Sequence, residues 1–287
     1  MQSNGRRALL GTSLLVLVSL LWGTSFPLIK VTVSEIGTSK YVVLRFGLST
    51  LLISPYFLYN FWKRNKRSFL SLGAGAILGV FYFGGIWLQG LGMEYTSASN
   101  AGFITSLYIP IVYAVDLIYK KRKYSRSFAV AMVLSVAGMY LVTGGSLESR
   151  LGDLIVLGGA VFWAFHVLAV DKFSKLHPSL ELVFAQYAVT AVLALLLSPS
   201  VELRWLDSLY YALFYLAVVC SLLVGVLQLV GQRYTTASQA SLVYASEPVF
   251  AALFSFLALG ERMGTRGLFG ASMIMVSILL SLRDMTR

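Results

Sequence analysis

Long apolar blocks alternate along the chain with short polar or charged junctions. The blocks run for roughly 18–23 residues, the length that an α-helix needs to cross about 30 Å of hydrocarbon at 1.5 Å per residue. A soluble core does not need helices of that length. The pattern therefore predicts an all-α integral membrane protein with ten transmembrane helices, near residues 9–31, 41–62, 69–92, 97–119, 127–144, 152–171, 180–198, 207–231, 236–259 and 266–282.

The composition also indicates a membrane protein. Hydrophobic residues make up 57% of the chain and charged residues only 12%, against about 45–50% and about 25% in soluble domains. The first apolar block is longer than that of a cleaved signal peptide and lacks a small-residue cleavage site, so we expect it to remain as a helix. The lipid bilayer of the cell membrane is the expected environment of this multi-pass chain.

The net charge of +11 could suggest a nucleic-acid partner. The basic residues, however, lie in short loops beside hydrophobic blocks, where they set membrane orientation, so no nucleic-acid binding is expected. With ten spans and an internal N-terminus, sixteen Lys and Arg residues fall inside, many of them in the loops 63–67 and 120–126, and six fall outside. This bias predicts that both termini are cytoplasmic.

The sequence shows no set of residues for catalysis, a metal or a cofactor. Cys220 stands alone in an apolar block, and His166 and His177 do not form a metal site by themselves. No Gly-x-Ser-x-Gly motif, pair of intramembrane aspartates or Cys/His set is present. A nucleophile, a base and a group that orients the base are all needed for an intramembrane enzyme. We expect that the protein is not an enzyme and needs no metal or cofactor.

The chain contains an internal repeat. Residues 88–101 reappear as residues 227–240, with eight of fourteen positions identical at an offset of 139. Nearly the same offset superposes Trp22 on Trp163 and Arg45 on Gln186. The chain thus reads as two copies of one unit, 1–146 and 147–287. Each copy holds five predicted spans, and an odd number inverts the second copy in the membrane. Inverted repeats with a site near the midplane are a recurrent plan of secondary transporters, whereas a receptor or scaffold leaves the repeat unexplained.

Several motifs resemble the EamA-type permeases of the drug/metabolite transporter superfamily. They are Leu21-Trp-Gly-Thr-Ser-Phe26, Leu44-Arg-Phe46, the Tyr-Thr segments that open the fourth and ninth spans, and Glu247-Pro-Val-Phe-Ala-Ala-Leu-Phe-Ser-Phe-Leu-Ala-Leu-Gly-Glu-Arg262. The resemblance covers essentially the whole chain. It implies a ten-helix exporter with both termini inside, and a central cavity lined mostly by spans 1, 3, 4, 6, 8 and 9, with spans 5 and 10 peripheral.

The first half departs from the family pattern in two places. Tyr108-Ile-Pro110 stands where the family has Glu-Pro or Tyr-Pro, with the Pro shifted by one residue against Pro248. The fourth span ends in Lys120-Lys-Arg-Lys123 without the family's Glu. The symmetry of the two halves is therefore imperfect at these positions.

Glu247 is the acidic residue that the predicted spans place near mid-membrane. An ionised carboxylate there costs several kcal/mol without a partner, and such groups often belong to substrate or proton pathways. The functional interpretation is a proton carrier or an anchor for a cationic substrate group. The structural alternative is a hydrogen-bonded side chain that satisfies backbone groups freed by Pro248, which has no N–H.

Eight residues on spans 1, 4, 6 and 9 are predicted to line one substrate cavity. His166 could carry a proton or bind a substrate carboxylate, but it could equally be a packed imidazole. The aromatic residues could line a site for a flat or apolar substrate, although packing explains each one singly. Arg45 is expected to snorkel or pair near a helix end. The predicted substrate-binding residues are Trp22, Ser25, Asn100, Tyr108, Trp163, His166, Tyr244 and Glu247.

Together these features predict a secondary transporter that exports small metabolites, such as amino acids or related amphipathic compounds, with protons as the candidate coupling ion. Hydrophobic cationic drugs and nucleotide sugars remain alternatives. Nucleotide sugars are disfavoured because phosphate binding calls for several cavity Lys or Arg residues, and the spans hold few besides Lys30 and Arg45.

Overall fold

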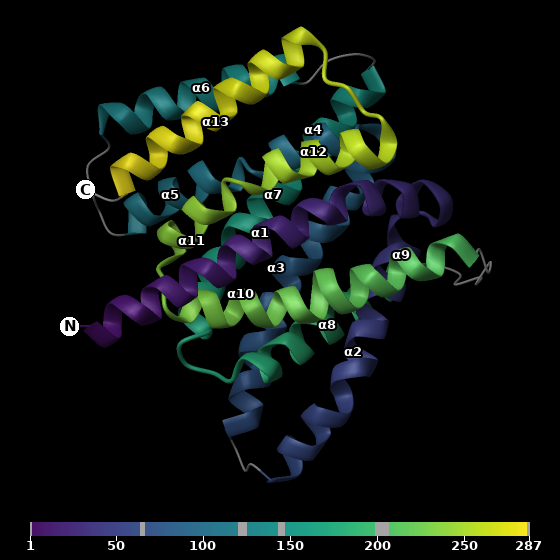
Figure 1. The fold of residues 1–287 in the computed structure, drawn as a ribbon. Coiled ribbons are helices and arrows are strands. Elements are labelled where there is room, and N and C mark those ends of the chain that lie inside the picture. The colour runs from purple at the N-terminus through teal and green to yellow at the C-terminus, as the bar shows by residue number, and fades with distance from the viewer. Residues whose placement is uncertain (1, 64–66, 120–124, 143–146, 199–206, 286–287) are drawn as a thin grey trace.

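The computed structural model describes residues 2–63, 67–119, 125–142, 147–198 and 207–285. In these ranges the chain is helical, and short turns connect successive helices (Figure 1). The loops 64–66 and 120–124, which contribute to the predicted charge bias, lie outside the described residues. The helices of the first half are α1 Gln2–Ile36, α2 Thr38–Lys63, α3 Arg67–Tyr95, α4 Ala98–Thr105, α5 Tyr108–Tyr119 and α6 Arg126–Val142.

The second half follows a similar order, with one long apolar stretch divided by a π-helical segment, η1. α9, η1 and α10 follow one another without a turn, so they form a single rod. The elements are α7 Leu147–Phe173, α8 Ser179–Leu196, α9 Asp207–Ala217, η1 Val218–Leu223, α10 Val224–Arg233, α11 Ala237–Tyr244, α12 Glu247–Leu259 and α13 Thr265–Met285.

Seven segments of the described chain are long and apolar enough to cross a membrane: Leu9–Ile36, Thr38–Tyr59, Leu70–Tyr95, Ala98–Val115, Ser149–Phe173, Ser179–Leu196 and Leu209–Arg233. The predicted spans 127–144, 236–259 and 266–282 are not among them. The first is α6, with 17 residues described. The second is split into α11 and α12, and the third, α13, has polar residues at both ends. The count of ten therefore stays a prediction.

Helices from the two halves pack against each other through the middle of the molecule. α3 contacts α7 and α8, and α1 contacts α10 and α12. α6 and α13 lie side by side at one edge, away from this core (Figure 1). α3 approaches α8 closely at a position without a side chain: a Cβ added at Gly79 would lie 2.7 Å from both the Gln186 carbonyl oxygen and the Val189 Cβ. Without side chains at such positions, helix backbones can approach closely.

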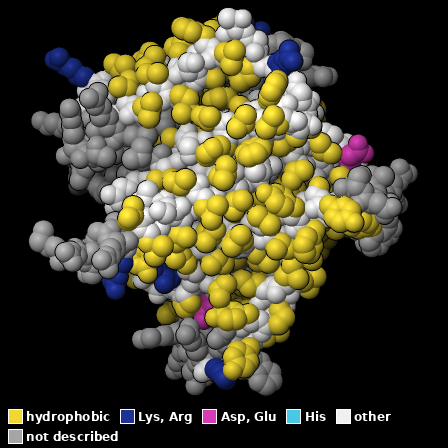
Figure 2. Space-filling view, viewed as in Figure 1, with side chains coloured by type: hydrophobic (Ala, Val, Ile, Leu, Met, Phe, Trp, Pro, Cys, Tyr) yellow, Lys and Arg dark blue, Asp and Glu magenta, His cyan; other side chains and the backbone are white. Residues whose placement is uncertain are grey.

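The outer surface is apolar. Figure 2 shows hydrophobic side chains spread over the visible face, with few charged side chains among them. Leu51 and Leu196 are 70% and 76% exposed, and Phe269 is 64% exposed. In water so much exposed apolar surface would be costly, whereas lipid accommodates it. Helices satisfy their own backbone hydrogen bonds, which a lipid environment requires.

Candidate functional site

A buried cavity lies at the centre of the bundle, between helices of both halves. Its empty volume is about 460 Å³, which includes space open to solvent, and the centre of a water molecule can occupy only about 30 Å³. The cavity is therefore narrow in this conformation. Its walls come from α1, α2, α3, α4, α5, α7, α10 and α12, and the lining residues are Trp22, Ser25, Phe26, Ile29, Arg45, Tyr82, Ile86, Gln89, Thr105, Tyr108, Trp163, Val167, Gln228 and Glu247.

Two helix breaks position polar side chains at this cavity. A turn interrupts the α-helix between α4 and α5, and another between α11 and α12. Tyr108 is the first residue of α5 and Glu247 the first of α12, and the two positions are related by the repeat offset of 139. Pro248 suits the first turn of a helix because its missing N–H has no intrahelical partner there. Helix N-termini at such breaks form the substrate sites of many transporters.

The cavity has an unusual number of polar groups without partners. Among the described residues no hydrogen bond or ion pair involves the Glu247 side chain, which is 8% exposed. The buried hydroxyls of Tyr108 and Thr105 and the amide nitrogen of Gln228 also lack partners within the described chain. Buried polar groups are nearly always hydrogen-bonded, and each exception calls for an explanation. A bound ligand or ordered water is the natural partner of these four groups.

Aromatic rings form the apolar wall of the cavity. The ring of Trp163 lies 4.8 Å from that of Tyr82 in an edge-on arrangement, and 6.5 Å from that of Trp22. Trp163 also donates a hydrogen bond of 2.9 Å from Nε1 to Gln89 Oε1, which fixes its orientation. A Cβ added at Gly85 would lie 2.7 Å from the Trp163 ring, so glycine is needed for this ring to fit. The wall is suited to an apolar or flat substrate group.

The structure brings five of the eight predicted site residues to this cavity: Trp22, Ser25, Tyr108, Trp163 and Glu247. Tyr244 is fully buried behind Trp22, with ring centroids 5.4 Å apart. His166 is packed against Trp163 and Tyr82, and its Nε2 lies 2.9 Å from Gln186 Oε1. That placement favours the packing alternative for His166.

Asn100 is not brought to the central cavity. It lies in the first turns of α4 and lines a second pocket, together with Glu261 and residues that follow α12. Its backbone N–H donates to Ser97 Oγ, the N-cap of α4. The sequence located Asn100 on the correct helix, but Thr105, five residues later in α4, is the residue of that helix that lines the cavity.

Arg45 differs from the expectation. Instead of snorkelling near a helix end, it is 1% exposed and lines the central cavity. Its guanidinium donates hydrogen bonds to Ser221 Oγ at 2.7 Å, to the Cys220 carbonyl at 3.0 Å, and to the Tyr41 hydroxyl. Those acceptors lie on η1 and on the preceding turn of α2. The sequence does not show that residues 218–223 are π-helical, so it could not identify Ser221 and the Cys220 carbonyl as partners of Arg45.

At one end of the cavity, carboxylates join helix termini. Glu261, which follows α12, accepts hydrogen bonds from the Ala98 and Ser99 N–H groups at 3.0 and 2.9 Å and from Ser99 Oγ at 2.7 Å. It thereby joins the second half to the N-terminus of α4 in the first half. Glu94 similarly accepts from the Thr38 N–H and hydroxyl at the start of α2. Carboxylates at helix N-termini are stabilising.

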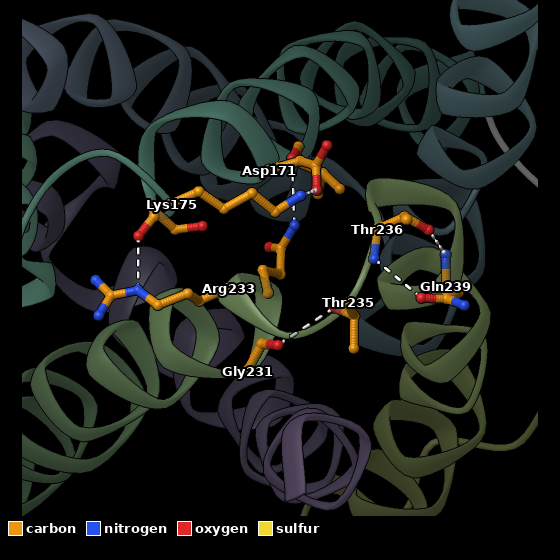
Figure 3. A network of polar contacts seen from close by, with 10 residues as sticks. Asp171, Lys175, Gly231, Arg233, Thr235, Thr236 and Gln239 are labelled. Atoms are coloured by element: carbon orange, nitrogen blue, oxygen red, sulfur yellow. Dashed lines mark hydrogen bonds and ion pairs between the residues drawn. The ribbon is translucent and has the colours of Figure 1, made fainter. Parts of the chain in front are cut away.

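At the opposite end of the cavity a basic side chain, Arg233, makes the corresponding hydrogen bonds (Figure 3). Arg233 stands at the repeat equivalent of Glu94, and it donates to the Ser174 and His177 carbonyls at 2.7 and 2.9 Å. Asp171 pairs with Lys175 at 2.6 Å, within one helix end. The repeat equivalent of Glu261 is residue 122, which lies outside the described residues. Among the described residues, a carboxylate of one half that binds a helix N-terminus of the other half is therefore found at the end of the cavity where Glu261 lies.

A cavity with partnerless polar groups, enclosed by apolar helices of which two are interrupted, is typical of membrane transporters. The chain belongs to the EamA-like transporter family, whose pattern matches it twice, at residues 9–144 and 150–283. It is thus a multi-pass membrane protein that transports a small molecule across a lipid bilayer, and it is not an enzyme.

Several proteins of similar sequence are named as transporters. An uncharacterized transporter of Archaeoglobus fulgidus is 27% identical and covers 93% of this chain and 83% of its own length. The uncharacterized transporter YyaM of Bacillus subtilis is 27% identical, covering 91% and 90%. The uncharacterized inner membrane transporter YicL of Salmonella typhimurium is 24% identical and covers 95% of each chain.

The fold also matches a solved structure. A crystal structure superposes with a TM-score of 0.65 and covers 96% of this chain and 99% of its own, at 16% identity. At that identity the likeness concerns the fold alone.

Proposed function

We propose that the protein is a secondary transporter that exports small amphipathic metabolites, such as amino acids, by alternating access to the central cavity. In this proposal ten transmembrane helices form two inverted five-helix repeats, 1–146 and 147–287, with both termini cytoplasmic. The observation that carries it is the cavity itself: partnerless polar groups of both halves, including Tyr108 and Glu247 at equivalent helix breaks, surround one narrow space. The export direction rests on the family resemblance.

Alternating access requires that one end of the cavity open while the other stays closed. The contacts at one end support this mechanism, because Glu261 of the second half binds the start of α4 in the first half there through hydrogen bonds that can break. At the other end the Arg233 hydrogen bonds lie within the second half, between α10 and the turn after α7. Protons are the proposed coupling ion, since Glu247 is a cavity carboxyl that can bind either a proton or a cationic substrate group.

A hydrophobic cation is the second candidate substrate, because Glu247 lies in the same cavity as Trp22, Tyr82 and Trp163. A nucleotide sugar is less well matched. Arg45 is the basic residue among the described cavity-lining side chains, and a diphosphate calls for several.

Counterflow by the purified protein in liposomes tests the proposal. Vesicles loaded with an unlabelled compound should accumulate the same labelled compound when the compound is an amino acid, and not when it is a nucleotide sugar. A panel of amino acids, hydrophobic amines and nucleotide sugars in which none shows counterflow would contradict the proposed function.

A further inference from the structure

One hydrogen bond joins the two halves of the protein at the wall of the cavity. Trp163 of α7, in the second half, donates from Nε1 to Gln89 Oε1 of α3, in the first half, at 2.9 Å. Both side chains are buried and line the cavity. Because the donor and the acceptor belong to different halves, this bond breaks when the halves move apart at this point.

The internal repeat provides a second pair of the same residue types. Gln228 of α10 is the equivalent of Gln89 at the offset of 139, and Trp22 of α1 is the equivalent of Trp163 at nearly the same offset. In this second pair the tryptophan belongs to the first half and the glutamine to the second. Both side chains line the same cavity as the first pair.

The helices that carry the two pairs cross in equivalent ways. A Cβ added at Gly152 of α7 would lie 2.7 Å from the Gly92 carbonyl oxygen of α3. At the equivalent crossing, a Cβ added at Gly11 of α1 would lie 2.9 Å from the Gly231 carbonyl oxygen of α10. Small residues allow both close approaches. The second tryptophan and glutamine therefore lie on two helices in contact, as the first pair does.

The second pair is nevertheless not hydrogen-bonded. The ring nitrogen of Trp22 donates to no acceptor among the described residues, and the buried Gln228 Nε2 has no partner within the described chain. The two side chains share a neighbour: the Tyr244 ring lies against that of Trp22, with centroids 5.4 Å apart, and the Tyr244 hydroxyl lies near the Gln228 amide. One structure thus contains one formed and one unformed Trp–Gln pair.

The two glutamines lie toward different ends of the cavity. Gln89 lies in the last two turns of α3, which leads into the start of α4 that Glu261 binds. We call this the outer end, where the proposed topology places it. Gln228 lies in the last two turns of α10, which ends at Arg233, at the inner end. The formed pair therefore joins the halves toward the outer end, where the Glu261 hydrogen bonds are also formed.

A fixed asymmetry of the sequence is the competing explanation. Gly85 makes room for the Trp163 ring against α3, whereas its repeat equivalent is the buried Val224. A valine side chain excludes a ring from the corresponding place against α10. Val224 does not line the cavity, however, while Trp22 and Gln228 both do. A hydrogen bond between the second pair can therefore form within the cavity, beside Val224.

We infer that the two Trp–Gln pairs form alternately: Trp163–Gln89 when the outer end is closed, and Trp22–Gln228 when the inner end is closed. This inference rests on the proposed function and names a contact that its two conformations exchange. Inverted halves can exchange roles between the two conformations. Replacing one hydrogen bond by an equivalent one keeps the free energies of the two conformations similar, so both can be populated.

A cysteine at Ser25 measures which end is open. It is placed in the Cys220→Ser protein, and its modification by an impermeant thiol reagent is followed in right-side-out and in inverted vesicles without substrate. The quantity compared is the ratio of the rate from the outside to the rate from the inside. A change in the local reactivity of the cysteine affects both rates and cancels in this ratio.

Substitutions in the two pairs should change the ratio in opposite directions. Trp163→Phe and Gln89→Leu remove the formed bond and should raise the ratio about threefold or more. Trp22→Phe and Gln228→Leu remove the bond of the other conformation and should lower it by a similar factor. The double variant of Trp22 and Gln228 should lower the ratio no further than either single variant, because both substitutions remove the same bond.

Trp87→Phe is the matched control. It removes a hydrogen bond of 3.1 Å from Trp87 Nε1 to Ser39 Oγ, and both of these residues belong to the first half. This variant should leave the ratio unchanged. Each bond is tested by two substitutions, and unfolding temperatures in detergent show which variants fold, so the remaining variant decides where one does not.

The outcomes separate this inference from the proposed function. If the Trp22 and Gln228 variants leave the ratio unchanged, or raise it as the Trp163 and Gln89 variants do, the second pair does not form. The inference is then wrong, and the transporter proposal stands as long as the cysteine reacts from both sides. Reaction from one side only, in the parent protein and in every variant, would overturn alternating access and the inference with it.

Discussion

Glu247 has a carboxyl that faces the cavity, and none of the described residues donates a hydrogen bond to it. The structural alternative required this side chain to satisfy backbone groups freed by Pro248, so its lack of such bonds favours a role in transport. Glu247→Gln removes proton binding but keeps the shape and a hydrogen-bond acceptor. We expect transport driven by a pH gradient to fall about tenfold or more, while counterflow at saturating substrate survives.

Liposomes that contain the purified variant provide the measurement, with a pH gradient in one set and none in the other. Glu35→Gln is the matched control, because Glu35 is exposed on α1, and it should behave as the wild type does. Undiminished gradient-driven transport by folded Glu247→Gln protein would rule out the proton-carrier role.

At the scale of single residues the sequence predicted which helices contribute to the site better than which side chains do. Trp22, Trp163 and Glu247 were identified because aromatic and acidic residues within spans stand out against an apolar background. Asn100 was misplaced relative to the cavity because helix periodicity does not show at which level along α4 the cavity lies; Thr105 reaches it and Asn100 lines a second pocket. Arg45 was expected to snorkel or to pair near a helix end, and two of its three acceptors belong to η1, about 175 residues away along the chain. No local sequence pattern predicts that contact.

At the scale of helices, the packing of α3 on α8 depends on positions without side chains. A Cβ at Gly79 would lie 2.7 Å from the Gln186 carbonyl oxygen, which is backbone and cannot turn aside. Gly79→Val should therefore destabilise the protein by roughly 1–3 kcal/mol, seen as a lower unfolding temperature in detergent. Gly73→Val on the same helix is the control, because a Cβ there meets nothing within 4 Å. Equal unfolding temperatures for the two variants would show that this contact does not form.

Glu261 provides a second prediction for the helix ends. Its carboxylate accepts three hydrogen bonds at the start of α4, and a cap of this kind contributes roughly 1 kcal/mol. Glu261→Gln should weaken the link between the halves and favour opening at this end. A cysteine at Ser25 in the cavity should then react faster with a membrane-impermeant thiol reagent added outside.

Arg262→Gln is the matched control, since Arg262 is exposed beside Glu261. In this variant the cysteine at Ser25 should react at the same rate as in the protein that carries the Ser25 cysteine alone. A rate unaffected by Glu261→Gln would mean that these hydrogen bonds do not hold the end closed.

The helices themselves were largely predictable, because their length and hydropathy follow from the thickness of the bilayer. Residues 207–231 were read as one span, and the structure has one rod there, α9–η1–α10. The interruptions at Ser106–Leu107 and at Ala245–Ser246 were not predicted. Pro110 and Pro248 signal a local disturbance, but neighbouring helices decide whether the chain kinks or stops.

At the scale of the whole molecule, the charge bias predicts the orientation in the membrane. In a protein whose Cys220 is replaced by Ser, a cysteine at Asn65 should react with an impermeant reagent only from the cytoplasmic side, and one at Gly264 only from the outside. Labelling of intact cells and of inverted vesicles provides the comparison. Reaction of the Asn65 cysteine in intact cells would reverse the proposed topology.

The central claim is that the two halves expose one cavity alternately to the two sides of the membrane. A cysteine at Ser25, which lines the cavity and lies on α1 between the halves, tests this claim most directly in the Cys220→Ser background. Its rate of modification by an impermeant thiol reagent is measured in right-side-out and in inverted vesicles, with and without the transported substrate. Modification from both sides, slowed by substrate in each case, is the predicted result. Modification from one side only, under all conditions, would contradict alternating access.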